Sequence, residues 1–129
     1  MDTTKALRFL GIGALWLVTV LLGVGFVLGG LSKFSPPWPD MFSRWGYPVF
    51  FTYVVGVVEA VAGLLLLVPK TAGPAAATLC VVMLGATATH LVHGESNWSF
   101  TLILVVIFAT IATVRYRLRS PRQVVGAEN

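Results

Sequence analysis

Four long runs of apolar residues alternate with short polar or proline-rich segments along this chain. The runs cover about residues 10–31, 49–68, 72–93 and 98–114. A helix of about 20 residues crosses the hydrocarbon core of a bilayer, within a range of roughly 17–25. Backbone groups in lipid must bond within their own segment, so each spanning run has to be helical. The pattern predicts an all-α protein, a four-transmembrane-helix bundle.

The connections between the runs set the order of the helices. The third and fourth runs are separated only by the short turn Gly94 to Asn97, which makes them antiparallel neighbours. Residues 32–48 form the longest connection, where Pro36, Pro37 and Pro39 exclude one continuous helix. At 129 residues, the chain has room for a single membrane domain, residues 1–129.

Composition and charge support the membrane setting. The chain is 57% hydrophobic and 11% charged, with a mean hydropathy of +0.86, which excludes an ordinary soluble domain. Its net charge of +4 could suggest a nucleic-acid partner. However, the basic residues flank the apolar runs and do not form a patch interleaved with aromatic residues, so we expect no nucleic-acid binding.

The distribution of Lys and Arg predicts the orientation. Loops on the cytoplasmic side of membrane proteins carry an excess of these residues. Two basic residues, Lys33 and Arg44, belong to the side that holds residues 32–48. The side of the termini carries the other seven: Lys5, Arg8, Lys70, Arg115, Arg117, Arg119 and Arg122. We therefore expect a multi-pass protein of the bacterial inner membrane, with both termini and a basic tail, residues 115–129, in the cytoplasm.

The outer loop, residues 32–48, is rich in aromatic side chains. Trp38, Trp45 and Tyr47 lie there, and Trp98 begins the fourth run. Trp and Tyr gather where the membrane meets water, so an aromatic belt is the first interpretation. The same side chains could instead roof a pocket for a lipophilic ligand, with Trp45 and Tyr47 as contacts.

Glu59 is a lone carboxylate within the second run, and it needs an explanation. An acid at that depth costs roughly 2.5–3.5 kcal/mol on insertion scales. Helical spacing places Gly56 and Gly63 on the same face as Glu59, together with Thr52 and Ala62. Small residues let a neighbouring helix approach closely, so this face is expected to point into the bundle.

Polar groups on the first and third runs could share a cavity with Glu59. Lys33 follows Gly29 and Gly30 at the end of the first run, and Thr87 and His90 share one stripe of the third. The fourth run carries no ionisable residue and is interpreted as packing. Counting about 1.5 Å per residue puts Glu59 about 16 Å below Pro48, so contact with Lys33 or His90 is left open. Two interpretations are weighed equally. Either Glu59 lies at the floor of a polar cavity, or it is a neutral residue that serves only helix packing.

Other chemistries are less well supported by the sequence. Cys80 is the single cysteine, so an internal two-cysteine relay is excluded. His90, His93 and Glu95 lie near one helix end, where they could form part of a metal site. Their spacing is weak evidence for one, and we expect no metal. Two histidines on one helix cannot bind one haem iron from opposite sides without a second subunit.

Several short motifs, in order, resemble those of one family. They are Gly29-x-x-x-Lys33, Arg44-Trp45-Gly46-Tyr47-Pro48, Gly56-x-x-Glu59-x-x-x-Gly63-x-Leu65, and residues 83–90 with His93-Gly94-Glu95. Together they resemble the DoxX-like membrane proteins from about Arg8 to Val114. The resemblance implies a small four-helix membrane protein. Some relatives resemble a subunit of a quinone-reducing thiosulfate oxidoreductase. Others are linked by resemblance to membrane complexes that handle oxidative or thiol stress, and a distant eukaryotic one resembles a receptor assembly chaperone.

Three functions stay open at this point. The first is a membrane subunit of a quinone-linked or thiol/sulfur-linked redox complex, in which Glu59, His90 and Lys33 handle protons. No motif encodes a cofactor, so a quinone is the candidate ligand and a partner protein must supply electrons. The second is a non-catalytic scaffold for another membrane protein, and self-association is a further open partnership. The third is an acid–base enzyme acting on a lipid-soluble substrate. The expected ligand contacts are Glu59, Thr87, His90, Trp45 and Tyr47.

Overall fold

The computed structural model describes residues 2–128, and the side chains of residues 2–117. The described residues form five helices: α1 Thr3–Ser32, α2 Trp38–Arg44, α3 Val49–Leu66, α4 Ala72–Val92 and α5 Trp98–Glu128. Four of them are long and apolar enough to cross a membrane, with a spanning stretch of Trp98–Arg117 in α5. The fold is therefore all-helical with four spanning helices, as the apolar pattern predicts.

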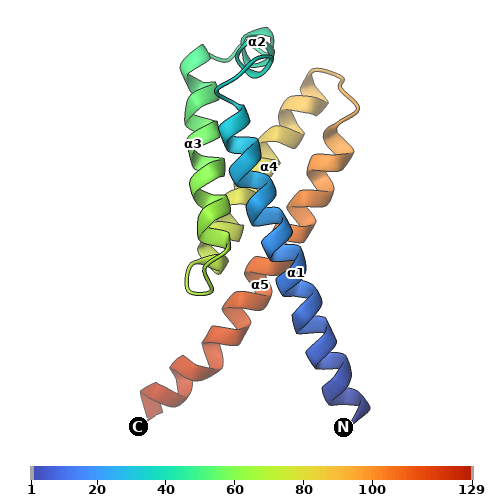
Figure 1. The fold of residues 1–129 in the computed structure, drawn as a ribbon, viewed down its shortest axis with the longest axis vertical. Coiled ribbons are helices and arrows are strands. Elements are labelled where there is room, and N and C mark those ends of the chain that lie inside the picture. The colour runs from blue at the N-terminus through green and yellow to red at the C-terminus, as the bar shows by residue number, and fades with distance from the viewer. Residues whose placement is uncertain (1, 129) are drawn as a thin grey trace.

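The long helices associate as two pairs. α1 packs against α3 and α4 packs against α5, while a smaller contact between α3 and α4 joins the pairs. Figure 1 shows that α1 and α5 cross, and that both chain ends lie at one end of the bundle. We call this the terminal end, and the opposite end, which carries α2, the α2 end. The assignment of the terminal end to the cytoplasm stays a prediction from the charge distribution.

Two helix boundaries differ from those expected from the sequence, and one additional helix is present. α1 begins at Thr3 instead of residue 10, and α5 continues to Glu128, so residues 115–128 extend a helix and do not form a separate tail. The side chains of Arg119 and Arg122 lie outside the described residues. The outer loop contains α2, with Pro39 in its first turn, where a missing backbone N–H costs least.

The α1–α3 pair is held together by very close backbone contact. A Cβ added to Gly63 would lie 2.8 Å from the carbonyl oxygen of Gly23, and one added to Gly56 would lie 2.7 Å from that of Gly30. Lipid is as apolar as the side chains it solvates, so helices associate in a membrane through such packing and not by the hydrophobic effect. These contacts fix the register of α1 along α3.

Replacing Gly63 by leucine is expected to destabilise the protein by about 1–3 kcal/mol, because the new side chain would force α1 away from α3. Thermal unfolding in mild detergent measures the loss. Gly13→Leu is the matched control, since nothing lies within 4 Å of a Cβ at that position of α1. Equal destabilisation by both substitutions would argue against the close approach.

The densest packing lies in the half of the bundle near the terminal end. Four large side chains there are almost completely inaccessible: Leu66, Leu79, Phe108 and Ile111. Phe26 of α1 meets Phe108 edge-on, with ring centroids 5.1 Å apart. The half near the α2 end is hollow, and Lys33, Glu59 and His90 lie there.

Candidate functional site

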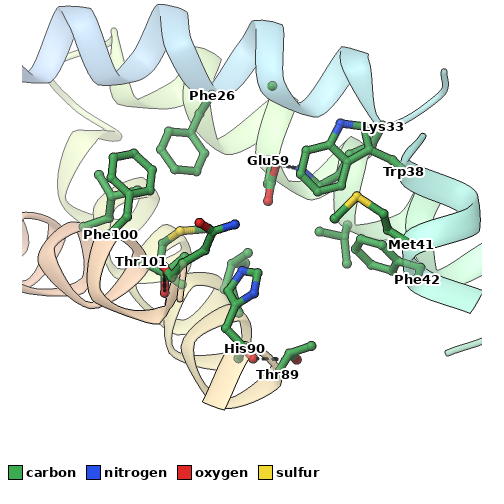
Figure 2. A pocket seen from close by; sticks show the side chains of 18 of the residues that line it. Phe26, Lys33, Trp38, Met41, Phe42, Glu59, Thr89, His90, Phe100 and Thr101 are labelled. Atoms are coloured by element: carbon green, nitrogen blue, oxygen red, sulfur yellow. Dashed lines mark hydrogen bonds and ion pairs between the residues drawn. The ribbon is translucent and has the colours of Figure 1, made fainter. Parts of the chain in front are cut away.

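A cavity of about 800 Å³ separates the α1–α3 pair from the α4–α5 pair. Its lining comes from all five helices and from the segment after α2. Figure 2 shows Trp38, Met41 and Phe42 of α2 across one end of the cavity, beside Lys33. Most of the lining is apolar. Leu21, Val81 and Phe100 line the cavity and yet are 63%, 67% and 65% exposed. The cavity is therefore open on its side, toward the region that lipid would occupy.

Lys33 and Glu59 form a buried ion pair on the α1–α3 side of the cavity. Lys33 Nζ lies 2.8 Å from Glu59 Oε2, and the two residues are 7% and 4% exposed. The contact between Gly30 and Gly56 explains the pairing, because it places the Lys33 Cβ beside Gly56, one turn above Glu59. The question left open by the sequence is thus answered: the carboxylate contacts Lys33.

The ion pair leaves hydrogen-bond donors and an acceptor oxygen available to a ligand. The ammonium has three N–H donors and the carboxylate two oxygens. Lys33 donates to Glu59 Oε2 and also lies over the Trp38 ring, 4.2 Å from its centroid. Glu59 Oε1 makes no hydrogen bond to any side chain that the structure describes. Figure 2 shows the carboxylate directed into the cavity.

His90 lines the opposite wall and does not bond to Glu59. Its Nδ1 lies 2.8 Å from Oε2 of Glu95, a residue of the turn after α4. The indole N–H of Trp45 donates to the other oxygen of Glu95, over 2.7 Å. Tyr47 and Thr89 share a hydrogen bond of 2.7 Å. These bonds attach the segment after α2 to the end of α4.

Glu95 is charged at neutral pH. The pKa of its carboxyl group lies below the ordinary value, because hydrogen bonds from Trp45 first and His90 second stabilise the ionised form. Its side chain is about one-third exposed, so it stands between the cavity and the α2-end surface.

Four of the five expected ligand contacts line the cavity. Glu59, His90, Trp45 and Tyr47 line the cavity, whereas Thr87 does not. The Thr87 hydroxyl lies 2.8 Å from the Met83 carbonyl oxygen of its own helix and 2.8 Å from Thr101 Oγ1 of α5, and Thr101 lines the cavity in its place. The interpretation of the fourth apolar run as packing is therefore incomplete.

Two groups of lining residues were not foreseen from the sequence. α5 contributes Phe100, Thr101 and Leu104, and Met41 and Phe42 join Trp38 in the roof. Tryptophan and phenylalanine in a loop of a membrane protein indicate an interface as readily as a pocket, so the sequence offered a weak signal for the roof and none for α5.

The histidines are arranged for hydrogen bonding within the chain. His93 Nδ1 lies 2.8 Å from the carbonyl oxygen of Thr89, while His90 bonds to Glu95. Among the side chains that the structure describes, no three His, Cys, Asp or Glu gather where they could hold a metal ion.

Comparison with known proteins shows the family of the chain. Residues 17–114, most of the chain, match the sequence model of the DoxX-like family. No curated protein and no solved structure matches.

Proposed function

The chain belongs to the DoxX-like family, and from this premise and the geometry of its cavity we propose that it binds a quinone-type molecule as the membrane subunit of a redox complex. The observation that carries the proposal is one cavity with apolar walls and two polar anchors. The Lys33–Glu59 pair is one anchor, and His90 with Glu95 is the other.

The size and character of the cavity suit such a ligand. Pockets for molecules of drug size measure roughly 300–1,000 Å³ and combine apolar walls with a few placed polar groups. A quinone ring with two carbonyl oxygens needs hydrogen-bond donors at both ends, and an ammonium and an imidazole are available on opposite walls. Its long apolar tail would leave through the lateral opening beside Leu21 and Phe100.

The polar anchors also suit the reaction. Reduction of a quinone to a quinol takes up two electrons and two protons, and both carbonyl oxygens become hydroxyls. Acids and bases placed within hydrogen-bond reach of those oxygens deliver the protons. In our proposal, His90 and the Lys33–Glu59 pair are these acids and bases. The electrons come from a partner protein that oxidises a thiol or another reduced sulfur compound.

The side of the membrane follows from the charge distribution. If the terminal end is cytoplasmic, as the excess of Lys and Arg there predicts, the α2 end and Glu95 face the opposite compartment. Protons consumed in the cavity then come from that compartment.

Binding of a short-chain benzoquinone to the detergent-purified protein tests the proposal. We expect saturable quenching of tryptophan fluorescence, since Trp38 and Trp45 line the cavity. We expect the affinity to fall at least about tenfold in His90→Phe, which corresponds to about 1.4 kcal/mol. Lys70→Met, an exposed position in the turn between α3 and α4, is the control and should bind as wild type.

Two results would overturn the proposal. Lack of saturable binding, with a membrane protein copurifying in fixed ratio, would favour a scaffold. Copurification of a lipid that is converted to an isomer by the wild type and not by Glu59→Gln would favour an acid–base enzyme.

A further inference from the structure

Each oxygen of the Glu95 carboxylate is held by a different part of the chain. Trp45 donates to Oε1 from the segment after α2, and His90 contacts Oε2 from the last turn of α4. A carboxylate held at both oxygens has a fixed orientation. The imidazole of His90 is fixed with it, and the Trp45 ring packs against that imidazole edge-on at 5.5 Å between centroids.

This contact determines which nitrogen of neutral His90 carries the proton. An ionised carboxylate only accepts hydrogen bonds, so Nδ1 must be the N–H that donates to Glu95. The other nitrogen, Nε2, then has a free lone pair when the ring is neutral and becomes a donor when the ring is protonated. Nε2 makes no hydrogen bond to any residue described in the structure, and Figure 2 shows the ring directed into the cavity.

We propose that Glu95 is a positioning residue that makes His90 bind the oxidised ligand when the imidazole is protonated and the reduced ligand when it is neutral. The inference rests on the proposed function. A quinone carbonyl only accepts hydrogen bonds, so it needs Nε2–H. A quinol hydroxyl donates, so it is satisfied by the bare Nε2 of the neutral ring.

The proton balance follows directly. Once the partner has supplied electrons, the Nε2–H bond breaks as an O–H bond forms on the former carbonyl oxygen. His90 becomes neutral and keeps its Nδ1–H on Glu95. The product hydroxyl faces a lone pair that accepts from it. Water in the cavity restores the proton on Nε2 after the quinol leaves.

Of the described charged and titratable groups near His90, Glu95 is the one that contacts its imidazole directly, and the others have different partners. From α1 and α3, Lys33 and Glu59 bond to each other. From α4, His93 bonds to the Thr89 carbonyl. From the segment after α2, the Tyr47 phenol bonds to the Thr89 hydroxyl, and α5 adds only neutral side chains to the cavity wall.

Glu95→Gln tests the inference, because an amide can both donate and accept and no longer fixes the proton on Nδ1. The affinities of a short-chain benzoquinone and its quinol are measured between about pH 5 and 8, where imidazoles titrate. For wild type we expect quinone affinity to fall about tenfold as the pH rises, and quinol affinity to rise. In Glu95→Gln the two pH dependences should flatten, because neutral His90 can then carry its proton on Nε2.

Nitrogen NMR of histidine-labelled protein reads the tautomer without any ligand. We expect Nδ1–H in wild type at high pH and a mixture of tautomers in Glu95→Gln. His93→Gln, a change outside the cavity lining, is the control and should keep the wild-type pH profile. Trp45→Phe, which removes the hydrogen bond to Oε1 and keeps an aromatic ring beside His90, serves as a second variant and should keep the Nδ1–H tautomer.

The outcomes separate the two proposals. If the wild type does not bind quinone, the proposed function fails, whatever the tautomer. If it binds quinone and Glu95→Gln shows the same tautomer and the same opposed pH profiles, quinone binding stands and the role of Glu95 is wrong.

Discussion

Replacing Lys33 by methionine is expected to destabilise the protein by about 3–5 kcal/mol, the usual cost of removing one partner from a buried ion pair. The substitution leaves the Glu59 carboxylate, 4% exposed, without the ammonium that lies 2.8 Å away. Unfolding in mild detergent, followed by helical circular dichroism, measures the loss. Lys70→Met provides the control for removing an exposed lysine.

The double variant, Lys33→Met with Glu59→Met, should recover most of this stability. Two apolar side chains of similar volume often replace a buried ion pair at no net cost, because desolvation of both charges is avoided. Quinone binding should stay lost, since both polar groups of one anchor are gone. If the double variant is as unstable as the sum of its single changes, the two side chains are not coupled in the folded protein.

Introducing phenylalanine at Gly25 is expected to weaken quinone binding about 100-fold, or about 2.7 kcal/mol. Gly25 lines the cavity, and nothing lies within 4 Å of a Cβ placed there. A phenyl group at this position would therefore enter space that the ligand needs. Thermal stability should be unchanged or higher, because the ring fills a void.

Gly11→Phe is the matched control for this substitution. Gly11 lies on the same helix, is equally open, and does not line the cavity. It should bind quinone as wild type. Unaltered affinity in Gly25→Phe, measured by fluorescence titration, would place the binding site elsewhere in the protein.

The fold and the inward orientation of Glu59 follow from the sequence, but its partner does not. The four apolar runs and the small residues around Glu59 carry local, periodic information. The pairing with Lys33 depends on how far α1 slides along α3, which the Gly30–Gly56 contact sets. The predicted topology placed Lys33 near the outer surface, whereas Lys33 is buried and lies over the Trp38 ring of α2.

The contacts of Glu95 and Thr101 depend on tertiary arrangement even more than the Lys33–Glu59 pairing does. Trp45 and Glu95 are 50 residues apart in the sequence, and no local pattern links an indole in a loop to a carboxylate in a later turn. Thr87 and Thr101 lie on neighbouring helices, and the small rotation of each helix decides which hydroxyl reaches the cavity. With 3.6 residues per turn, the periodic pattern predicts which residue of a helix faces a neighbour only to within about one position.

The packed half of the bundle separates the cavity from the terminal end of the protein. The lining residues nearest the terminal end are Leu21, Glu59, Val81 and Leu104. Beyond them lie Leu66, Leu79, Phe108 and Ile111, each 1% exposed or less. A layer of this kind offers no file of water along which protons could hop, so the cavity ends blindly within the membrane. Under the proposed function, protons therefore reach the cavity from the α2 end alone, and the membrane keeps its ion gradient.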